Sequence, residues 1–379
     1  MLNYNLFYVG TDVISTGGIQ TYSRYQIKAL EGLANIHVFN LVDACAEDNV
    51  VEDINFLVRG WKLNKLGRVS RVAKFKFAII LWWHFLRIRP TVIICNHISL
   101  APLLYMLQRV FKFKYVLNVY GLEIWSGINS LERRALESAD FIVGDCEHIC
   151  TYISEKFYVD SKQLRVIYDP VDVEIYKPLG IDKPELLGRY GLANGFYILT
   201  VGRLARNKGH KAVIKALSSL PNDVRYLIAG QGAMLDELLD LAEKEKVSDR
   251  VFFLGRVENQ ELPYLYNLCD VHVLISVMDK DEGEGLPLTP IEAAACGAPL
   301  IVGGEDGSLE AVETSENNGI VINPRSSKDL LCALNKMYQS YDYRESLGVA
   351  GVRFVANNFT FDRFKNDHSE LMLQLNLKD

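Results

Sequence analysis

Residues 197–209 read Tyr-Ile-Leu-Thr-Val-Gly-Arg-Leu-Ala-Arg-Asn-Lys-Gly, a largely apolar run that leads into a glycine and a basic loop. The run does not alternate between polar and apolar positions, so we expect a strand buried on both faces, as in parallel sheets. A helical pattern follows as far as Leu220, and the segment therefore predicts a strand–loop–helix unit.

The same unit recurs along the chain, and we expect strands at 6–10, 36–42, 92–95, 115–119, 141–144, 164–168, 197–201, 224–229, 251–254, 271–275, 300–302 and 319–322. Between residues 169 and 194, prolines and glycines interrupt the alternation, which indicates an interdomain linker. We therefore predict an α/β protein with two Rossmann-like, doubly wound domains, residues 1–180 and 190–360, facing an interdomain crevice.

Composition indicates the compartment. The longest apolar run covers residues 77–86, far short of the ~20 residues that a membrane-spanning helix needs. The first residues carry no secretion signal, so we expect a cytoplasmic protein. Cys146 and Cys150 form a C-x3-C pair without a second pair nearby, and we expect reduced thiols there instead of a metal site.

A basic segment lies within a chain whose net charge is −6. No acidic residue occurs between Asp53 and Glu123, whereas twelve basic residues do: Arg59, Lys62, Lys65, Arg68, Arg71, Lys74, Lys76, Arg87, Arg89, Arg109, Lys112 and Lys114. Region 59–114 thus suits peripheral contact with an anionic membrane at the inner face of the cytoplasmic membrane, or a diphosphate-bearing acceptor; a solvated basic face without a partner is the alternative. The basic residues at 59–74 recur every third position and drift around a helix, so they do not predict an inserted helix. No nucleic-acid-binding motif accompanies the charges, and we expect no nucleic-acid partner.

Three glycine-bearing segments follow expected strands. Gly17 and Gly18 open the first helix, where backbone amides and the helix dipole favour an anion, although a plain turn is the alternative. Arg203 and Lys208 follow the strand at 197–201 and could reach one diphosphate, or else only provide surface charge. Gly230 ends the next strand with a small residue where a ligand could pass.

Residues 284–292 read Glu-Gly-Leu-Pro-Leu-Thr-Pro-Ile-Glu, and the prolines favour a helix that starts at Pro287. Pro290 is tolerated because the first amides of a helix have no intrahelical partner. The amides of Gly285, Leu286 and the two residues after Pro287 would then form a phosphate cradle that needs no metal. Glu284 would lie beside a sugar, and Glu292 could accept hydrogen bonds from ribose hydroxyls.

Together these segments resemble the family 4 glycosyltransferases with the GT-B fold. The likeness covers nearly the whole chain and includes the E-x7-E element at 284–292, GRVENQELPYLY at 255–266, ACGAP at 295–299 and the loop at 303–311. It implies a retaining transfer from a nucleotide-sugar such as a UDP- or GDP-sugar, with no metal or other cofactor. It also implies that a C-terminal helix, 361–375, packs back on the first domain.

The resemblance also assigns roles to residues. Arg203 and Lys208 resemble the pair that holds the donor diphosphate, Glu292 the ribose-binding carboxylate and Glu284 the carboxylate beside the donor sugar. Further positions resemble those that contact the base or the phosphates: Arg256, Val257, Gly17 and Gly18.

One position departs from the family pattern. Many members have a histidine over the donor sugar where this chain has Tyr120, followed by Gly121, Leu122 and Glu123. A tyrosine can donate a hydrogen bond but is no general base near pH 7. His97 is the nearest substitute on the acceptor or donor-sugar side, although a histidine at a strand end is equally often structural.

We therefore expect a hexosyltransferase-type glycosyltransferase that acts on a saccharide or polyprenyl-diphosphate-linked acceptor in polysaccharide or lipopolysaccharide biosynthesis. Three alternatives remain: a metal-dependent transferase using the D-x-D at 279–281, a sugar-nucleotide epimerase-like enzyme, and an inactive sugar-nucleotide-binding module. The two-domain layout disfavours the first alternative, because the D-x-D motif belongs to a single-domain fold.

Overall fold

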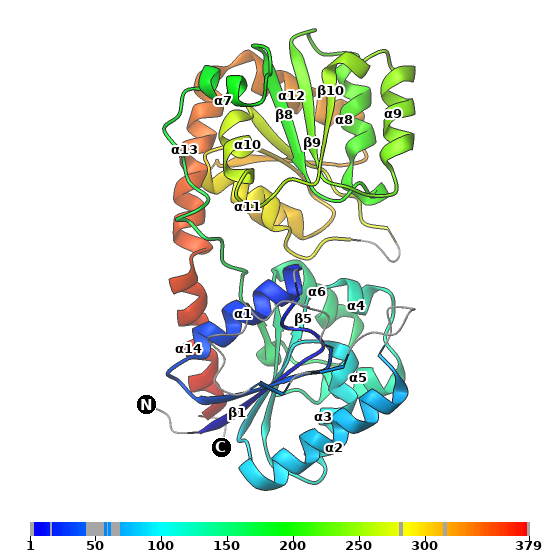
Figure 1. The fold of residues 1–379 in the computed structure, drawn as a ribbon, viewed down its shortest axis with the longest axis vertical. Helices are drawn as coiled ribbons and strands as arrows, with labels where there is room; N and C mark the ends of the chain where they lie inside the picture. Colours follow the sequence, from blue (N-terminus) through cyan, green and yellow to red (C-terminus); the bar gives the residue numbers. More distant parts are fainter. Residues whose placement is uncertain are drawn as a thin grey trace. The chain divides into compact units, whose positions relative to one another are not determined.

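A computed structural model describes residues 4–15, 17–42, 57–58, 60–61, 69–279, 283–313 and 317–376. Contacts divide the chain into two compact units, the first made of Met1–Asp169 with Phe361–Asp379 and the second of Pro170–Thr360. Each unit is an α/β sandwich around one parallel sheet (Figure 1). Within the described ranges, no helix combines the length and the apolar content that crossing a bilayer requires.

The first unit contains a parallel sheet in the order β3-β2-β1-β4-β5-β6-β7. Its strands are β1 Asn5–Gly10, β2 Asn35–Asn40, β3 Leu57–Val58, β4 Val92–Cys95, β5 Lys114–Val119, β6 Phe141–Gly144 and β7 Leu164–Val166. Its helices are α1 Gly18–Leu30, α2 Arg71–Ile88, η2 Ile98–Leu100, α3 Ala101–Gln108, α4 Leu122–Trp125, α5 Ser130–Glu137, α6 Glu147–Lys156, η3 Ser161–Gln163 and α14 Phe361–Asn376.

Strand β1 shows why this sheet needs helices on both faces. Leu6, Phe7 and Tyr8 are all fully buried, although successive side chains point to opposite faces. Leu6 and Tyr8 share a core with α1 and α14, whereas the ring of Phe7 packs against Phe85 of α2, 5.3 Å away. The last helix of the chain thus completes the core of the first unit.

The second unit contains a parallel sheet in the order β10-β9-β8-β11-β12-β13. Its strands are β8 Phe196–Val201, β9 Val224–Ala229, β10 Val251–Gly255, β11 Val271–Leu274, β12 Leu300–Gly303 and β13 Gly319–Ile322. Its helices are α7 Lys183–Arg189, η4 Arg206–Lys208, α8 His210–Leu217, α9 Leu235–Lys244, η5 Ser248–Arg250, α10 Leu262–Leu268, α11 Leu288–Ala295, η6 Gly307–Ala311, α12 Ser327–Gln339 and α13 Tyr341–Asn358. Helix α7 lies inside the segment for which the prolines and glycines predicted only a linker.

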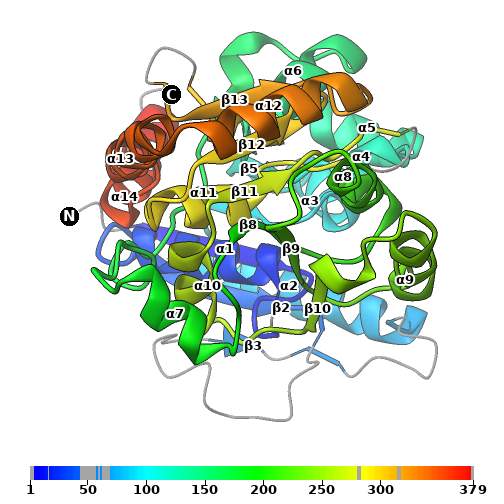
Figure 2. The ribbon, with the colours of Figure 1, turned by 90° about the horizontal axis from the view of Figure 1, so that it is seen from above.

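Helices cover both faces of the second sheet, with α8, α9 and α12 on one face and α10, α11 and α13 on the other (Figure 2). The strand order reverses between β8 and β11, which pair in parallel. In open α/β sheets, ligands bind at the carboxyl ends of the strands where the order reverses. The loops after β8 and β11 are therefore the expected location of a site in this unit.

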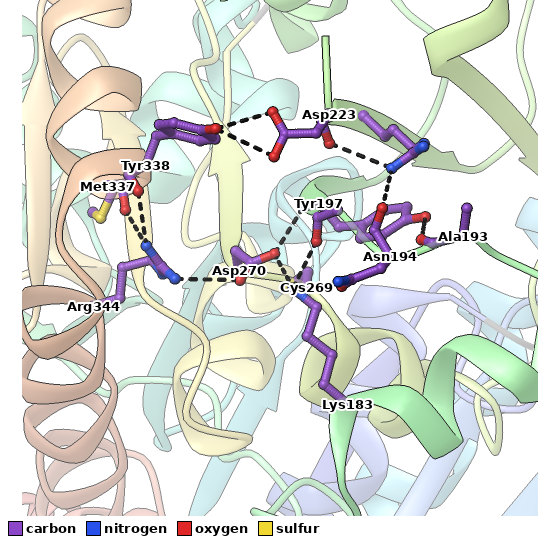
Figure 3. A network of polar contacts seen from close by, with 12 residues as sticks. Lys183, Ala193, Asn194, Tyr197, Asp223, Cys269, Asp270, Met337, Tyr338 and Arg344 are labelled. Carbon is purple, nitrogen blue, oxygen red and sulfur yellow. Dashed lines mark hydrogen bonds and ion pairs between the residues drawn. The ribbon is translucent and has the colours of Figure 1, made fainter. Parts of the chain in front are cut away.

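The amino-terminal edge of the second sheet is held by Asp270, which directly precedes β11 (Figure 3). Its carboxylate accepts a hydrogen bond of 2.8 Å from the amide of Tyr197 in β8 and forms an ion pair with Lys183 of α7. The guanidinium of Arg344 in α13 lies 3.6 Å from the other carboxylate oxygen. One side chain that is only 11% exposed thus connects two strands and two helices.

We predict that Asp270→Asn lowers the free energy of unfolding by ~2–3 kcal/mol, because it leaves two largely covered cations without their counter-charge. The measurement is urea unfolding followed by far-UV circular dichroism. Tryptophan fluorescence is a poor probe here, because all four tryptophans (Trp61, Trp82, Trp83 and Trp125) belong to the first unit.

The matched control is Glu237→Gln, which removes an ion pair with Lys211 whose two side chains are 52% and 44% exposed. Such exposed pairs contribute under about 1 kcal/mol, so this variant should unfold close to the wild type. Equal losses in the two variants would show that Asp270 is no more than a surface charge.

Candidate functional site

Lys208 and Glu284 form the centre of the site in the second unit. Lys208 is buried, and its Nζ lies 2.9 Å from Oε1 of Glu284. The side-chain amide of Asn207 donates to the same oxygen at 3.4 Å. The structure thus joins two residues for which the sequence predicted separate contacts, and Glu284 gives the buried cation of Lys208 a counter-charge.

Arg203 follows β8 and has an exposed side chain, in contrast to Lys208. Its backbone carbonyl is fixed by Nε2 of His210, 3.3 Å away, whose Nδ1 lies 3.0 Å from the hydroxyl of Tyr226. The guanidinium is therefore carried by a fixed backbone but stays open to solvent. That combination suits a cation that meets an anionic ligand.

Gly230 lies against the loop that carries Arg203. A Cβ at Gly230 would lie 1.8 Å from the carbonyl oxygen of Gly202, and one at Gly232 would lie 2.4 Å from that of Leu204. The close approach of these two loops is enough to require glycine at both positions. A role for Gly230 in letting a ligand pass stays a prediction.

The segment at 284–292 differs from the expectation in one detail. Helix α11 begins at Leu288, and Pro287 is its N-cap with an extended backbone, so the helix starts one residue later than predicted. A proline at this position loses nothing, because its missing amide would lie outside the helical hydrogen bonds. Pro290 lies in the first turn, as expected, and leaves the helix intact.

Asp306 holds the backbone of Glu284 and was not predicted as a site residue. Its carboxylate accepts from the amide of Glu284 at 3.3 Å, and the amide of Gly307 donates to the carbonyl of Glu284 at 3.2 Å. Burial raises the pKa of Asp306 to about 6. The signal available in the sequence was the Asp-Gly-Ser turn inside the loop at 303–311.

Glu292 lies one turn into α11 and accepts a hydrogen bond of 2.8 Å from the hydroxyl of Tyr266 in α10. Burial raises the pKa of Glu292 to about 7, because charging the carboxyl there costs more than in water. Tyr266 is fully buried and was not predicted as a site residue, although it ends the 255–266 stretch. Its hydroxyl fixes the carboxyl of Glu292, for which the sequence suggested binding to a ribose.

Arg256 and Val257 follow the last residue of β10, which is the edge strand of the sheet. The Arg256 side chain is 72% exposed, and its Nε lies 4.0 Å from Oε1 of Glu258. This places both residues at the carboxyl edge of the sheet, near the end of its strand order. A contact with a nucleotide base stays a prediction.

Gly17 and Gly18 lie where the sequence predicted, at the start of α1 in the first unit. The carbonyl of Gly17 accepts from the amide of Thr21 at 2.9 Å, and the first turn contains no acidic residue. The positive end of the helix dipole is therefore not offset by a carboxylate within that turn.

Tyr120 is enclosed by other side chains of the first unit. Its ring meets Tyr22 edge to face at 5.2 Å, and its hydroxyl has no hydrogen-bond partner within the described part of the chain. Its amide donates to Glu123 at 2.6 Å, so the Glu123 carboxylate holds the turn before α4. Burial raises the pKa of Tyr120 well above its usual range, which keeps the phenol protonated.

His97 has a structural contact of its own. Its Nδ1 accepts from the amide of Ser99 at 3.2 Å and caps η2. Burial lowers the pKa of His97, so the ring is neutral at pH 7. Lys280 and Asp281 of the D-x-D sequence, and Arg59, Lys62, Lys65 and Arg68 of the basic region, lie outside the described residues.

Two family models match this chain. Residues 182–353 match the model described as glycosyl transferases group 1, and residues 16–175 match the one described as Glycosyltransferase Family 4. A GDP-mannose-dependent alpha-(1-6)-phosphatidylinositol monomannoside mannosyltransferase of Mycobacterium tuberculosis is 28% identical over 233 residues. That match covers 58% of this chain and 60% of the relative, so the chain spans less than two thirds of that protein's length.

Two solved structures are similar over nearly their whole length. HepE of Anabaena in complex with UDP has a TM-score of 0.82 at 18% identity, with 98% of this chain and 100% of that chain covered. Sucrose-phosphate synthase of Thermosynechococcus elongatus has a TM-score of 0.80 at 19% identity, with 99% and 100% covered. At such identities the likeness establishes the fold alone, and it confirms the predicted fold class of two doubly wound units.

We predict that Glu292→Gln changes how stability depends on pH. The pKa of Glu292 is about 7 in the folded protein, against 4.5 for an ordinary glutamate. Between pH 4.5 and pH 7 the folded chain therefore binds a proton on this carboxyl that the unfolded chain has released. Wild-type stability gains from this proton at pH 5 and loses the gain as the pH rises through 7. Relative to the wild type, the variant should become more stable by ~2–3 kcal/mol between pH 5 and pH 8.

Urea unfolding at pH 5, 6, 7 and 8 measures this difference. Glu258→Gln is the control, because the Glu258 side chain is 79% exposed and should give a curve parallel to the wild type. A Glu292→Gln curve that is also parallel would mean that this carboxyl titrates at its ordinary pKa.

Proposed function

Because the chain belongs to the GT-B glycosyltransferases, with family models matching residues 16–175 and 182–353, we propose that it transfers a hexosyl group from a nucleotide-diphosphate sugar to an acceptor hydroxyl. The observation that carries the proposal is the buried Lys208–Glu284 pair, which lies next to the start of α11. A cation, a carboxylate and a helix amino terminus then lie within one short stretch of the fold, and this set suits a sugar diphosphate.

Each component has a role in the proposed reaction. The bond between the anomeric carbon and the diphosphate oxygen breaks, and its electron pair goes to the leaving diphosphate. Arg203, Lys208 and the amides around Gly285 and Leu286 stabilise that charge. The acceptor oxygen forms the new bond on the same face of the sugar and gives its proton to the leaving diphosphate, so the configuration is retained.

The remaining residues position the donor. Glu292, held by Tyr266, accepts hydrogen bonds from the ribose, and Glu284 contacts the sugar. Arg256, Val257 and Gly230 flank the base and diphosphate, and Gly17 and Gly18 are proposed as further backbone amides for a phosphate. Tyr120, Glu123 and His97 are proposed for the acceptor or donor-sugar side; the phenol of Tyr120 is buried within the first unit and is not a base.

Donor and acceptor are proposed at the level of class. HepE binds UDP and the mycobacterial relative uses GDP-mannose, so a UDP- or GDP-sugar is the donor proposed here. That relative acts on a phosphatidylinositol glycoside, which supports a lipid-linked saccharide as acceptor, in polysaccharide or lipopolysaccharide biosynthesis. The basic region at 59–114 would meet the inner face of the cytoplasmic membrane through anionic headgroups. A thermal-shift series with UDP-, GDP- and ADP-sugars identifies the base.

We predict that Arg203→Ala and Lys208→Ala each lower the rate of sugar transfer by ~100- to 1000-fold, because each removes a charge that stabilises the leaving diphosphate. The measurement is transfer of a radiolabelled sugar from the donor that the thermal-shift series selects. Arg206→Ala is the matched control, since Arg206 is an exposed cation in the same loop with no role in the proposal.

Circular dichroism checks that each variant is folded. Near-normal transfer by both variants would refute the diphosphate roles. The reaction is also expected to continue in EDTA, and its abolition with recovery on adding Mg²⁺ would favour a metal-dependent transferase. Turnover of donor alone into an epimer would favour the epimerase alternative, and donor binding without turnover would favour an inactive binding module.

A further inference from the structure

Helix α2 presents a row of large apolar side chains to solvent. Six of them are between 41% and 67% exposed: Val72, Phe75, Ile79, Trp82, Trp83 and Leu86. At ~100° per residue these positions fall within an arc of about 100° on one side of the helix. They therefore form one continuous stripe, which we call the α2 stripe.

The opposite side of α2 is apolar as well. Phe77, Leu81 and Phe85 are buried, and Phe85 packs against Phe7 of the sheet. A helix at the surface of a water-soluble domain normally has one apolar face and one polar face. Scattered exposed apolar residues are common, but a continuous patch with two tryptophans marks a surface that meets an apolar partner.

Basic side chains border the α2 stripe. Lys76 and Arg87 lie next to Trp83 around the helix, and the Arg87 guanidinium is 5.3 Å from the Trp83 ring. Phe111 packs against Trp82 at 5.0 Å, which brings a segment with two exposed cations, Arg109 and Lys112, beside the helix. The surface therefore combines apolar side chains with a basic rim and, from residue 54 to 122, has no acidic residue.

We propose that the α2 stripe inserts into the interface of an anionic lipid bilayer, with α2 lying on the membrane plane. The apolar side chains enter the boundary between headgroups and acyl chains, where tryptophan is favoured, and the cations meet lipid phosphates. This inference rests on the proposed function and makes its membrane contact more specific. The proposed function needs only attraction between basic residues and anionic headgroups, whereas here named apolar side chains insert into the bilayer. The basic residues at 59–74, which recur every third position, had suggested no insertion; the α2 stripe begins within that range at Val72, and its other residues lie between 75 and 86.

Charge distinguishes this partner from a second copy of the chain. In a symmetric dimer the same patch would face itself, which would bring the basic rim of one copy near the basic rim of the other. Like charges across an interface disfavour association, whereas anionic headgroups are complementary to the rim. An anionic bilayer therefore fits both components of the surface.

The test is co-sedimentation of the full chain with vesicles of phosphatidylcholine alone or mixed with phosphatidylglycerol. We expect binding to the mixed vesicles, with a blue shift of tryptophan emission as Trp82 and Trp83 leave water. The double variant Phe75→Ser with Trp83→Ser should reduce partitioning roughly tenfold or more, because it removes two large side chains from the insertion. Lys76→Glu with Arg87→Glu should weaken binding to the mixed vesicles only.

The control is Leu235→Ser with Leu239→Ser, which removes two exposed apolar side chains from α9 and should leave binding unchanged. Binding that persists in the Phe75/Trp83 variant, without a blue shift and lost in high salt, would overturn insertion and leave contact by charge alone. A dimer that this variant dissociates, with no vesicle binding, would overturn the proposal in favour of a second copy.

Vesicle binding needs neither donor nor acceptor, so it separates this inference from the enzymatic proposal. Transfer to a water-soluble acceptor should be equal in the wild type and the Phe75/Trp83 variant. Binding without any transfer would count against the enzymatic proposal alone, whereas transfer without binding would count against insertion alone.

Discussion

In both units the paired strands run parallel, so the carboxyl ends of all strands in a sheet meet at one edge. Strands buried on both faces hold few polar side chains, with Asn118, Thr200 and His272 as buried exceptions, so most polar residues lie in the loops at the edges of the sheets. In the second unit the amino-terminal and carboxyl edges of the sheet have different roles. The amino-terminal edge holds Asp270 and its cations, which stabilise the fold, whereas the opposite edge holds the Lys208–Glu284 pair.

The charged groups at the carboxyl edge are arranged at some cost to stability. Glu292 has a pKa of about 7 and Asp306 of about 6, in both cases because burial disfavours the ionised form. A carboxyl that served stability alone would be better exposed or better paired. In the proposed function both buried carboxyls have a role. Glu292 accepts hydrogen bonds from the ribose hydroxyls of the donor, and Asp306 fixes the backbone of Glu284.

The first unit contributes a different kind of surface. Its sheet is covered by α1 and α14 on one face and by α2 on the other, and α2 carries apolar side chains on both its inner and outer sides. Tyr120 lies in the same unit, where its phenol stays protonated. Under the two proposals above, the α2 stripe binds the membrane that carries a lipid-linked acceptor. The loops at the carboxyl ends of the strands bind the substrates.

Much of the fold and part of the site could be predicted from local patterns. Apolar runs of strand length predicted all the main strands of both sheets, because burial on both faces leaves a signal in consecutive residues. The prolines at 287 and 290 predicted the helix start to within one residue, since proline is tolerated only in the first turn. Helix α7 was not predicted, because the prolines and glycines around it indicate turns and give no sign of a short helix between them.

Contacts between distant residues could not be read in the same way. Three contacts of the site each join different loops or helices. They are the ion pair of Lys208 with Glu284, the hydrogen bond from Tyr266 to Glu292, and the hydrogen bond from the amide of Glu284 to Asp306. Which loops meet depends on strand order, and the reversal between β8 and β11 has no signature in either strand. The α2 stripe is of the same kind: the sequence contains its residues, but only packing on the sheet determines which side of an apolar helix is left facing water.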